Sequence, residues 1–269
     1  MLKDITIGQY FPTDSVIHKT DPRVKILIIF IYIVFLFIIN SFLGYGLMVL
    51  WIIAATAASK LPIKLLFKGL KPLRWIILIT FIINVLFTQG TPIFSIGPIN
   101  ISQEGIIVAI RLAFRLCLLV LGTSLLTLTT SPVTLTDGIE GLLSPLKVVG
   151  FPAQELAMMI TIALRFIPTL IDETDKILKA QMARGADFES GNILNRAKNM
   201  VPLIVPLLLS SINRADELSI AMEARCYNGD KGRTKLNPLE LKGRDILIFG
   251  ICILYYLGIV LFERFIWLT

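Results

Sequence analysis

The apolar residues of this chain are gathered into long runs, and this clustering limits the folds that it can adopt. A helix that spans a membrane needs about 17–25 mostly apolar residues. Five runs approach that length: residues 26–42, 45–59, 73–88, 106–128 and 246–262. With 55% hydrophobic residues, a soluble chain of 269 residues would have too little polar surface. The pattern predicts an all-α membrane protein with about five transmembrane helices.

Lysine and arginine are distributed unevenly among the connections between these runs. The segment before the first run carries four of them, and the connection 60–74 carries five. The turn near Asn40 and the loop 89–105 carry none. Because basic connections stay in the cytoplasm, we expect the N-terminus to lie inside a plasma membrane. Five crossings then place residues 131–244 inside and the C-terminus outside.

The charge pattern divides the chain into three parts. Residues 1–130 hold the N-terminal segment and four spans, residues 131–244 form a cytoplasmic region, and residues 245–269 form the last span. The middle part carries fourteen of the 26 basic residues. Its apolar stretches, 156–170 and 201–212, are too polar or too interrupted by proline to be predicted as spans. The prolines concerned are Pro152, Pro168, Pro202 and Pro206.

Residues 166–182 predict an amphipathic helix within the cytoplasmic region. Apolar side chains recur at helical spacing, while Asp172, Glu173, Lys176 and Lys179 fall on the opposite face. Two interpretations are open, packing against a neighbouring helix and binding to the membrane surface; the first is favoured. The charged face is explained as solvated or bridged between neighbouring turns, and no acid/base pair is inferred from it.

A weak internal repeat relates this helix to a later one. A shift of 41 residues aligns two helix ends, Ala183, Arg184 and Gly185 with Ala224, Arg225 and Cys226. The repeat predicts two similar elements, each ending in the dipeptide Ala-Arg.

The residue types at these ends suit the docking of a partner protein. The unpaired carbonyls and the macrodipole of a helix C-terminus favour a cation. Small residues beside it allow another backbone to approach closely, and a guanidinium group pairs with carboxylates through two hydrogen bonds. An ordinary capping arginine explains either site alone. Two equivalent sites favour a paired docking function.

Other kinds of chemistry find little support in the sequence. The single histidine, His18, has no metal-ligand spacing and no nearby nucleophile, and the three cysteines have no metal-site or disulfide spacing. No glycine-rich phosphate loop is present. The net charge of +7 is not arranged as a basic stripe interleaved with aromatic residues, so no nucleic acid partner is expected. We expect neither a catalytic site, nor a metal, nor a cofactor.

Two arginines, Arg111 and Arg115, lie four residues apart on one face of the fourth run. Charges inside a membrane are costly and often functional. Arg111 lies near the outer end, where its side chain can reach the interface. Arg115 lies deeper and is expected to face protein. A structural role and a place in a transport pathway both remain open for them.

Three blocks of the sequence resemble a known family. They are residues 15–25 (SVIHKTDPRVK), 164–187 (LRFIPTLIDETDKILKAQMARGAD) and 206–229 (PLLLSSINRADELSIAMEARCYNG). Together they are similar to the transmembrane T component of energy-coupling factor (ECF) transporters, ABC-type systems that take up vitamins and metals. One departure is Cys226, where the family usually has glycine or another small residue.

The resemblance implies a non-enzymatic subunit that works with partners. Members of the family pair with two related ATPases and one small substrate-binding membrane subunit, the S subunit. Arg184 and Arg225 would each dock one ATPase, and the amphipathic helices would offer an apolar surface to the S subunit. The leading alternative is a stand-alone secondary transporter or channel. Such proteins place polar groups on broken helices at the membrane midplane, whereas these runs are nearly free of charge.

Overall fold

The computed structural model describes residues 10–96, 99–186, 188, 192–227, 229 and 238–268. They form two compact units. The first, which we call the bundle unit, contains residues 8–139 and 239–269. The second, the crossing unit, contains residues 140–238.

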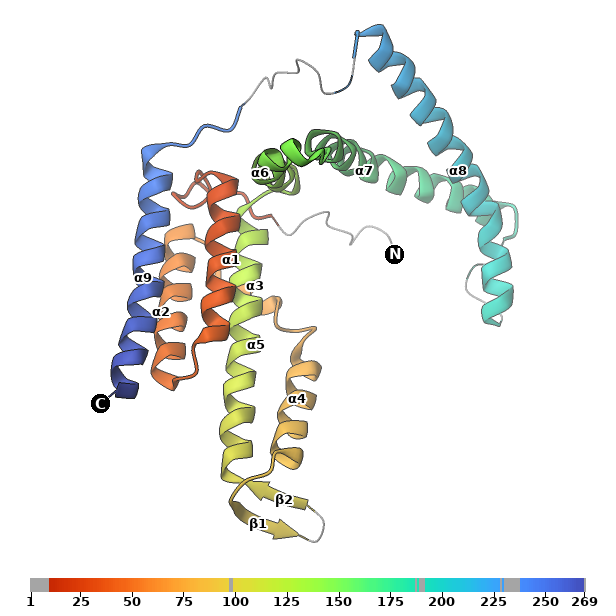
Figure 1. The fold of residues 1–269 in the computed structure, drawn as a ribbon. Helices are drawn as coiled ribbons and strands as arrows, with labels where there is room; N and C mark the ends of the chain where they lie inside the picture. Colours follow the sequence, from red (N-terminus) through yellow and green to blue (C-terminus); the bar gives the residue numbers. More distant parts are fainter. Residues whose placement is uncertain are drawn as a thin grey trace. The chain divides into compact units, whose positions relative to one another are not determined.

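Six helices make up most of the bundle unit (Figure 1): α1 (Pro22–Ile38), α2 (Phe42–Ser59), α3 (Ile63–Lys68), α4 (Arg74–Phe87), α5 (Gln103–Thr129) and α9 (Gly243–Leu268). The long helix α5 is at its centre, because it packs against α1, α2, α3 and α4. Helix α9 packs against α1 and α2. Most of α6 (Pro132–Leu143) also belongs to this unit.

A short antiparallel hairpin joins α4 to α5. Its strands are β1 (Pro92–Ile96) and β2 (Ile99–Ser102). The carboxylate of Glu104 accepts a hydrogen bond from the backbone N–H of Thr91 at 2.8 Å, which ties the start of the hairpin to the first turn of α5. The loop expected between residues 89 and 105 therefore contains a structured hairpin, which the sequence reasoning did not predict.

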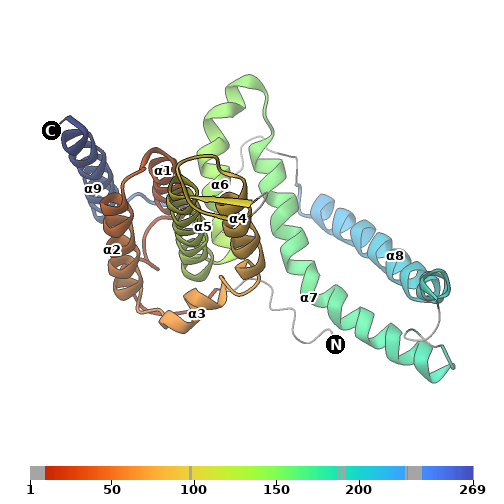
Figure 2. The same cartoon turned by 90° about the horizontal axis from the view of Figure 1, so that it is seen from below.

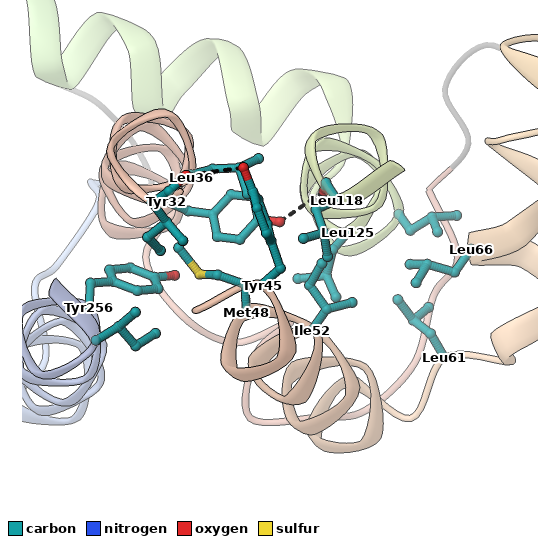
Figure 3. Close-up of a cluster of buried hydrophobic side chains, with 13 residues drawn as sticks. Tyr32, Leu36, Tyr45, Met48, Ile52, Leu61, Leu66, Leu118, Leu125 and Tyr256 are labelled. Atoms are coloured by element: carbon teal, nitrogen blue, oxygen red, sulfur yellow. Dashed lines mark hydrogen bonds between the residues drawn. The ribbon is translucent and has the colours of Figure 1, made fainter. Parts of the chain in front are cut away.

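The core of the bundle unit is built around large aromatic side chains (Figure 3). Tyr32 from α1 and Tyr256 from α9 are fully buried, and their ring centroids lie 6.2 Å apart. The hydroxyl of Tyr32 donates to the backbone carbonyl of Leu118 in α5 at 2.9 Å, which satisfies its polar end. A Cβ atom at Gly122 would lie 2.4 Å from the Tyr32 ring, so the missing side chain is what lets α1 approach α5.

The helices confirm the predicted fold class, with an approximate number of spans. Among the described residues four helices are long and apolar enough to cross a membrane, namely α2, α5, residues 243–265 of α9, and α7 (Ala153–Ala183). Helix α7 contains residues 156–170, which were not predicted as a span. Helices α1 and α4, which overlap the first and third predicted runs, have 17 and 14 residues, so α1 reaches the lower limit for a span and α4 is shorter. The predicted count of five is therefore approximate.

The prolines of the crossing unit do not interrupt its helices, contrary to our expectation. Pro168 lies inside α7, which has 31 residues, and Pro202 and Pro206 lie inside α8 (Ile193–Ala224), which has 32. Each proline removes one helical hydrogen bond. In helices this long, the remaining hydrogen bonds and the packing of α7 on α8 outweigh that cost. A short 3₁₀ helix, η1 (Ser144–Val149), precedes α7.

The polar segment before α1 folds around the single histidine. Nε2 of His18 lies 3.0 Å from the backbone carbonyl of Phe11, and Nδ1 lies 2.7 Å from the hydroxyl of Ser15. Burial lowers the pKa of His18 from its ordinary value. The neutral ring, which donates through Nε2 and accepts through Nδ1, fits both contacts. His18 therefore has a structural role in this segment.

A buried lysine joins that segment to the end of α5. The ammonium group of Lys25, which is only 7% exposed, donates to the backbone carbonyls of His18 and Thr129 at 3.2 and 3.1 Å. It also lies 3.4 Å from the hydroxyl of Thr130. Because Thr129 is the last residue of α5, the cation lies where the macrodipole of that helix is negative.

Charged side chains from two other helices hold the tight turn between α1 and α2. Arg115 of α5 donates to the backbone carbonyl of Ile39 at 3.1 Å, at the C-terminal end of α1. Glu263 of α9 accepts from the backbone N–H groups of Asn40 and Ser41 at 2.8 and 2.7 Å, at the N-terminal end of α2. Each charge matches the helix dipole beside it. The sequence left two roles open for Arg115, a structural one and a place in a transport pathway. This contact supports the structural role.

We expect loss of either charge at this turn to destabilise the bundle unit. Arg115→Met and Glu263→Gln should each cost about 1–2 kcal/mol, because charge-assisted bonds to helix ends are removed. Thermal unfolding of the detergent-solubilised protein, followed by tryptophan fluorescence, measures the effect. Arg264→Gln is the matched control, since Arg264 is exposed and adjacent to Glu263. An equal loss of stability in that control would contradict the assignment.

Candidate partner-docking site

The two Ala-Arg elements lie at the C-terminal ends of α7 and α8. Both helices belong to the crossing unit and pack against each other (Figure 2). The residues predicted to dock a partner are exposed at both ends: Ala183, Arg184, Gly185, Ala224, Arg225 and Cys226. Within the part of the chain that the structure describes, neither arginine forms an ion pair. Both guanidinium groups are thus accessible to a partner.

The end of α7 is closed by a backbone motif that needs a left-handed residue. The N–H of Gly185 donates to the carbonyl of Met182 at 3.0 Å, and the N–H of Ala186 donates to that of Gln181 at 3.0 Å. This pair of bonds defines a Schellman motif. Gly185 has φ +86°, a conformation that costs glycine little because it has no Cβ.

The end of α8 has the same motif at the equivalent positions. The N–H of Cys226 donates to the carbonyl of Glu223 at 2.9 Å, and the N–H of Tyr227 donates to that of Met222 at 3.0 Å. Every donor and acceptor lies 41 residues after its counterpart in α7, so the weak repeat corresponds to a real structural equivalence. Cys226 has φ +58°. The departure from glycine therefore places an L side chain in a left-handed conformation.

An ion pair joins α7 and α8 where the two helices meet. Arg214 of α8 donates to the carboxylate of Glu173 in α7 at 3.2 Å, and the Ser210 hydroxyl donates to the other oxygen of that carboxylate. The guanidinium group also lies 5.8 Å from the ring centre of Phe166. With side-chain exposures of 23% and 29%, Glu173 and Arg214 are largely shielded from water.

This contact corrects the predicted face of the amphipathic helix. Glu173 was expected on a solvated face with Lys176 and Lys179, but it faces α8. Packing against a neighbouring helix, the favoured interpretation of this segment, is what the structure shows. The sequence reasoning missed Arg214. A signal was present, because Arg214 follows Glu173 by the 41 residues of the repeat, so equivalent positions carry opposite charges.

The ion pair places the two Ala-Arg ends in opposite directions. Glu173 contacts Ser210, and eight residues later in α7 the side chain of Gln181 donates to the backbone carbonyl of Pro202 at 3.4 Å. The contacted residue in α8 thus comes earlier in the sequence as the contact in α7 comes later. The two helices therefore pack antiparallel. Arg184 and Arg225 each follow the ion pair by 11 residues, about 16 Å of helix at 1.5 Å per residue. On straight antiparallel helices, these lengths correspond to a separation of about 30 Å between the two ends.

Other candidate chemistry finds no support among the described residues. They contain no group of three or more histidine, cysteine, aspartate or glutamate side chains able to hold a metal ion. Cys117 and Cys252 are half-buried and, like Cys226, are free thiols.

Comparison with known proteins identifies the family. Residues 13–236 match the CbiQ family model, described as cobalt transport protein. A protein of Clostridium kluyveri is 56% identical over 269 residues, which cover 99% of both chains. Relatives from Ruminiclostridium cellulolyticum and Bacillus subtilis are 51% and 47% identical, covering 98% and 91% of this chain and 98% and 93% of their own.

All three relatives are named energy-coupling factor transporter transmembrane protein EcfT. The chain therefore belongs to the CbiQ family and to its branch of transmembrane components of ECF transporters. This confirms the resemblance found in the sequence. Together with the apolar helices, it makes the chain a multi-pass membrane protein.

The two left-handed positions predict opposite responses to substitution. Cys226→Gly should stabilise the end of α8 by about 1 kcal/mol, because the steric cost of a Cβ atom at positive φ is removed. Gly185→Ala should destabilise the end of α7 by a similar amount. Hydrogen exchange measures both effects. The amide of Tyr227 should exchange about fivefold more slowly in Cys226→Gly, and the amide of Ala186 about fivefold faster in Gly185→Ala.

Gly243→Ala is the control for these variants, since Gly243 has no positive φ and a Cβ atom added there would meet no other atom within 4 Å. Unchanged exchange at Tyr227 in Cys226→Gly would show that the left-handed residue does not limit the stability of this helix end.

Proposed function

We propose that this chain is the energy-coupling scaffold of an ECF-type importer and docks one ATPase at each Ala-Arg end. The observation that supports this most strongly is the repeated backbone motif on two exposed helix ends that point in opposite directions from one crossing. A single partner site would not need two such ends about 30 Å apart. Two related ATPases, one at each end, fit this arrangement.

The chemistry of each end fits a groove with acidic or carbonyl acceptors. Arg184 and Arg225 would form bidentate hydrogen bonds there, which guanidinium groups make better than ammonium groups do. Ala183 and Ala224 beside them are small and exposed, so the partner's backbone can approach each helix end closely. The scaffold itself catalyses no reaction, and ATP is hydrolysed by the partners.

An apolar stripe on α8 supports the docking of a substrate-binding S subunit. Its seven side chains are each about half exposed and recur at helical spacing: Met200, Val201, Ile204, Val205, Leu208, Leu209 and Ile212. An exposed stripe of this extent on a long helix marks a surface for protein or lipid. We assign it to the S subunit, which would carry the vitamin or other micronutrient.

The crossing gives the scaffold a means to transmit motion. When ATP binding closes the two ATPases, the ends at Arg184 and Arg225 would be drawn with them. The Glu173–Arg214 contact would then act as the pivot, and the stripe on α8 would shift the S subunit. The basic connections favour a cytoplasmic location for the N-terminus and residues 131–244, on the side of the cell membrane where the ATPases are.

Reversal of the two docking arginines tests this function. Arg184→Glu and Arg225→Glu should each weaken recovery of an ATPase with the membrane complex by roughly tenfold or more, because a carboxylate would then face the acceptors. The double reversal should abolish both assembly and uptake. Co-purification of the ATPases and uptake of the substrate in cells measure these effects.

Lys179→Glu supplies the matched control, because Lys179 is an exposed cation on the same helix as Arg184 and lies outside the motif. Normal assembly and uptake with both arginines reversed would contradict the proposal. Substrate transport by the purified chain alone, in vesicles without ATPases, would instead support a stand-alone transporter.

A further inference from the structure

The connection between α2 and α4 carries a dense and unbalanced positive charge. Its five basic residues are all exposed: Lys60, Lys64, Lys68, Lys71 and Arg74. No acidic residue occurs anywhere between Asp21 and Glu104. In the described part of the chain none of the five forms an ion pair. The positive charge is therefore available to an anionic group from outside the chain.

Beside this connection lies an apolar groove. It has a volume of about 740 Å³ and is bounded by α2, α3 and α5, with Ile53, Ala57, Phe67 and Leu121 among its lining residues. Lys60 is the charged residue in its lining. The groove thus combines a long apolar wall with one cation.

Lys60 occupies a backbone conformation that disfavours lysine. It ends α2 with φ 55° and ψ 28°, in the left-handed region, and its N–H donates to the carbonyl of Ala57 at 3.1 Å. Glycine or asparagine would fit this position with less strain. Strain of this kind is often found at binding sites. A lysine here is explained if its charge is used at the groove.

The short helix α3 continues the same arrangement. Figure 2 shows α3 lengthwise while α1 and α5 are seen nearly end on, so α3 runs across the bundle. Lys64 and Lys68 are four residues apart and share one face of it. Ile63 and Phe67 are 63% and 57% exposed. A helix with exposed cations and exposed apolar residues, lying across a membrane bundle, is typical of the lipid–water interface.

The start of α4 also has the features of that interface. Trp75 is 61% exposed, and the guanidinium group of Arg74 lies 5.4 Å from its ring centre. Tryptophan is enriched at the level of the lipid headgroups. Both features favour a position of the basic connection at the level of the lipid headgroups.

We propose that the groove between α2, α3 and α5 binds one acyl chain of an anionic phospholipid, whose headgroup phosphate pairs with Lys60 and Lys64. The apolar wall takes the chain, and the cluster of cations selects a negatively charged headgroup. This site is distinct from the docking ends and does not depend on the proposed function.

A second apolar cavity in the bundle unit shows why the cation matters. That cavity, of about 410 Å³, is lined by Ala58 of α2 and by Lys25. The ammonium group of Lys25 already lies within hydrogen-bonding distance of three acceptors of the chain. It has little capacity left for a headgroup, so this cavity is not expected to select anionic lipid.

Native mass spectrometry of the full chain, purified in detergent and supplied with phosphatidylglycerol or phosphatidylcholine, tests the proposal. The wild-type protein should retain more phosphatidylglycerol than phosphatidylcholine, and raised salt should weaken the retention of phosphatidylglycerol. Lys60→Asn, which keeps the left-handed backbone, and Lys64→Gln should each lower retention about fivefold. Ala57→Leu, which fills the groove, should lower retention of the lipid as well.

Two matched controls accompany these variants. Lys176→Gln removes an exposed lysine of the crossing unit, and Ala58→Leu fills the second cavity from the same turn of α2. Both should leave retention unchanged. Equal retention of the two lipids by the wild-type protein would overturn the proposal. So would an Ala57→Leu variant that retains phosphatidylglycerol as well as the wild-type protein does.

Discussion

The arrangement of the docking ends depends on one ion pair, between Glu173 of α7 and Arg214 of α8. It joins equivalent positions of a 41-residue repeat, so the two helices meet at corresponding points and run in opposite directions. A contact between equivalent positions places the two equivalent ends symmetrically about it. The ion pair is largely shielded from water and reinforced by the Ser210 hydroxyl, so loss of one partner would leave an uncompensated charge between the helices.

The bundle unit uses charged groups in a related way, at the ends of helices rather than at their crossing. Arg115 and Glu263 bind the end of α1 and the start of α2, and Lys25 binds the end of α5. In an apolar environment, backbone groups left without partners are costly. Charges that satisfy them are therefore stabilising where isolated charges would not be. The cations of α3 and its flanks have no such partners among the described residues, which is why we assign them to lipid.

Much of the fold could be predicted from the sequence, because a long apolar run predicts a helix whose side chains contact lipid or the protein core. The third predicted run, 73–88, differs from α4 by one residue at each end. The repeat likewise predicted two equivalent helix ends, which share one backbone motif. Partners across the fold could not be predicted, because the Glu173–Arg214 pair and the Arg115–Ile39 bond depend on how helices pack. That Pro168 lies inside a continuous helix could not be predicted either, because the packing around that helix offsets the hydrogen bond that the proline removes.

The distance between the two docking ends is the most direct measure of the crossing. Spin labels on Cys226 and on an Ala186→Cys variant, with Cys117 and Cys252 replaced, report it by pulsed electron paramagnetic resonance. We expect one narrow distribution at about 37 Å, because the labelled positions lie 13 and 12 residues beyond Glu173 and Arg214. It should broaden in Glu173→Arg and narrow again when Arg214→Glu is added. A short distance, or a distribution that the reversed charges leave unchanged, would contradict the crossing as the element that positions the two ends.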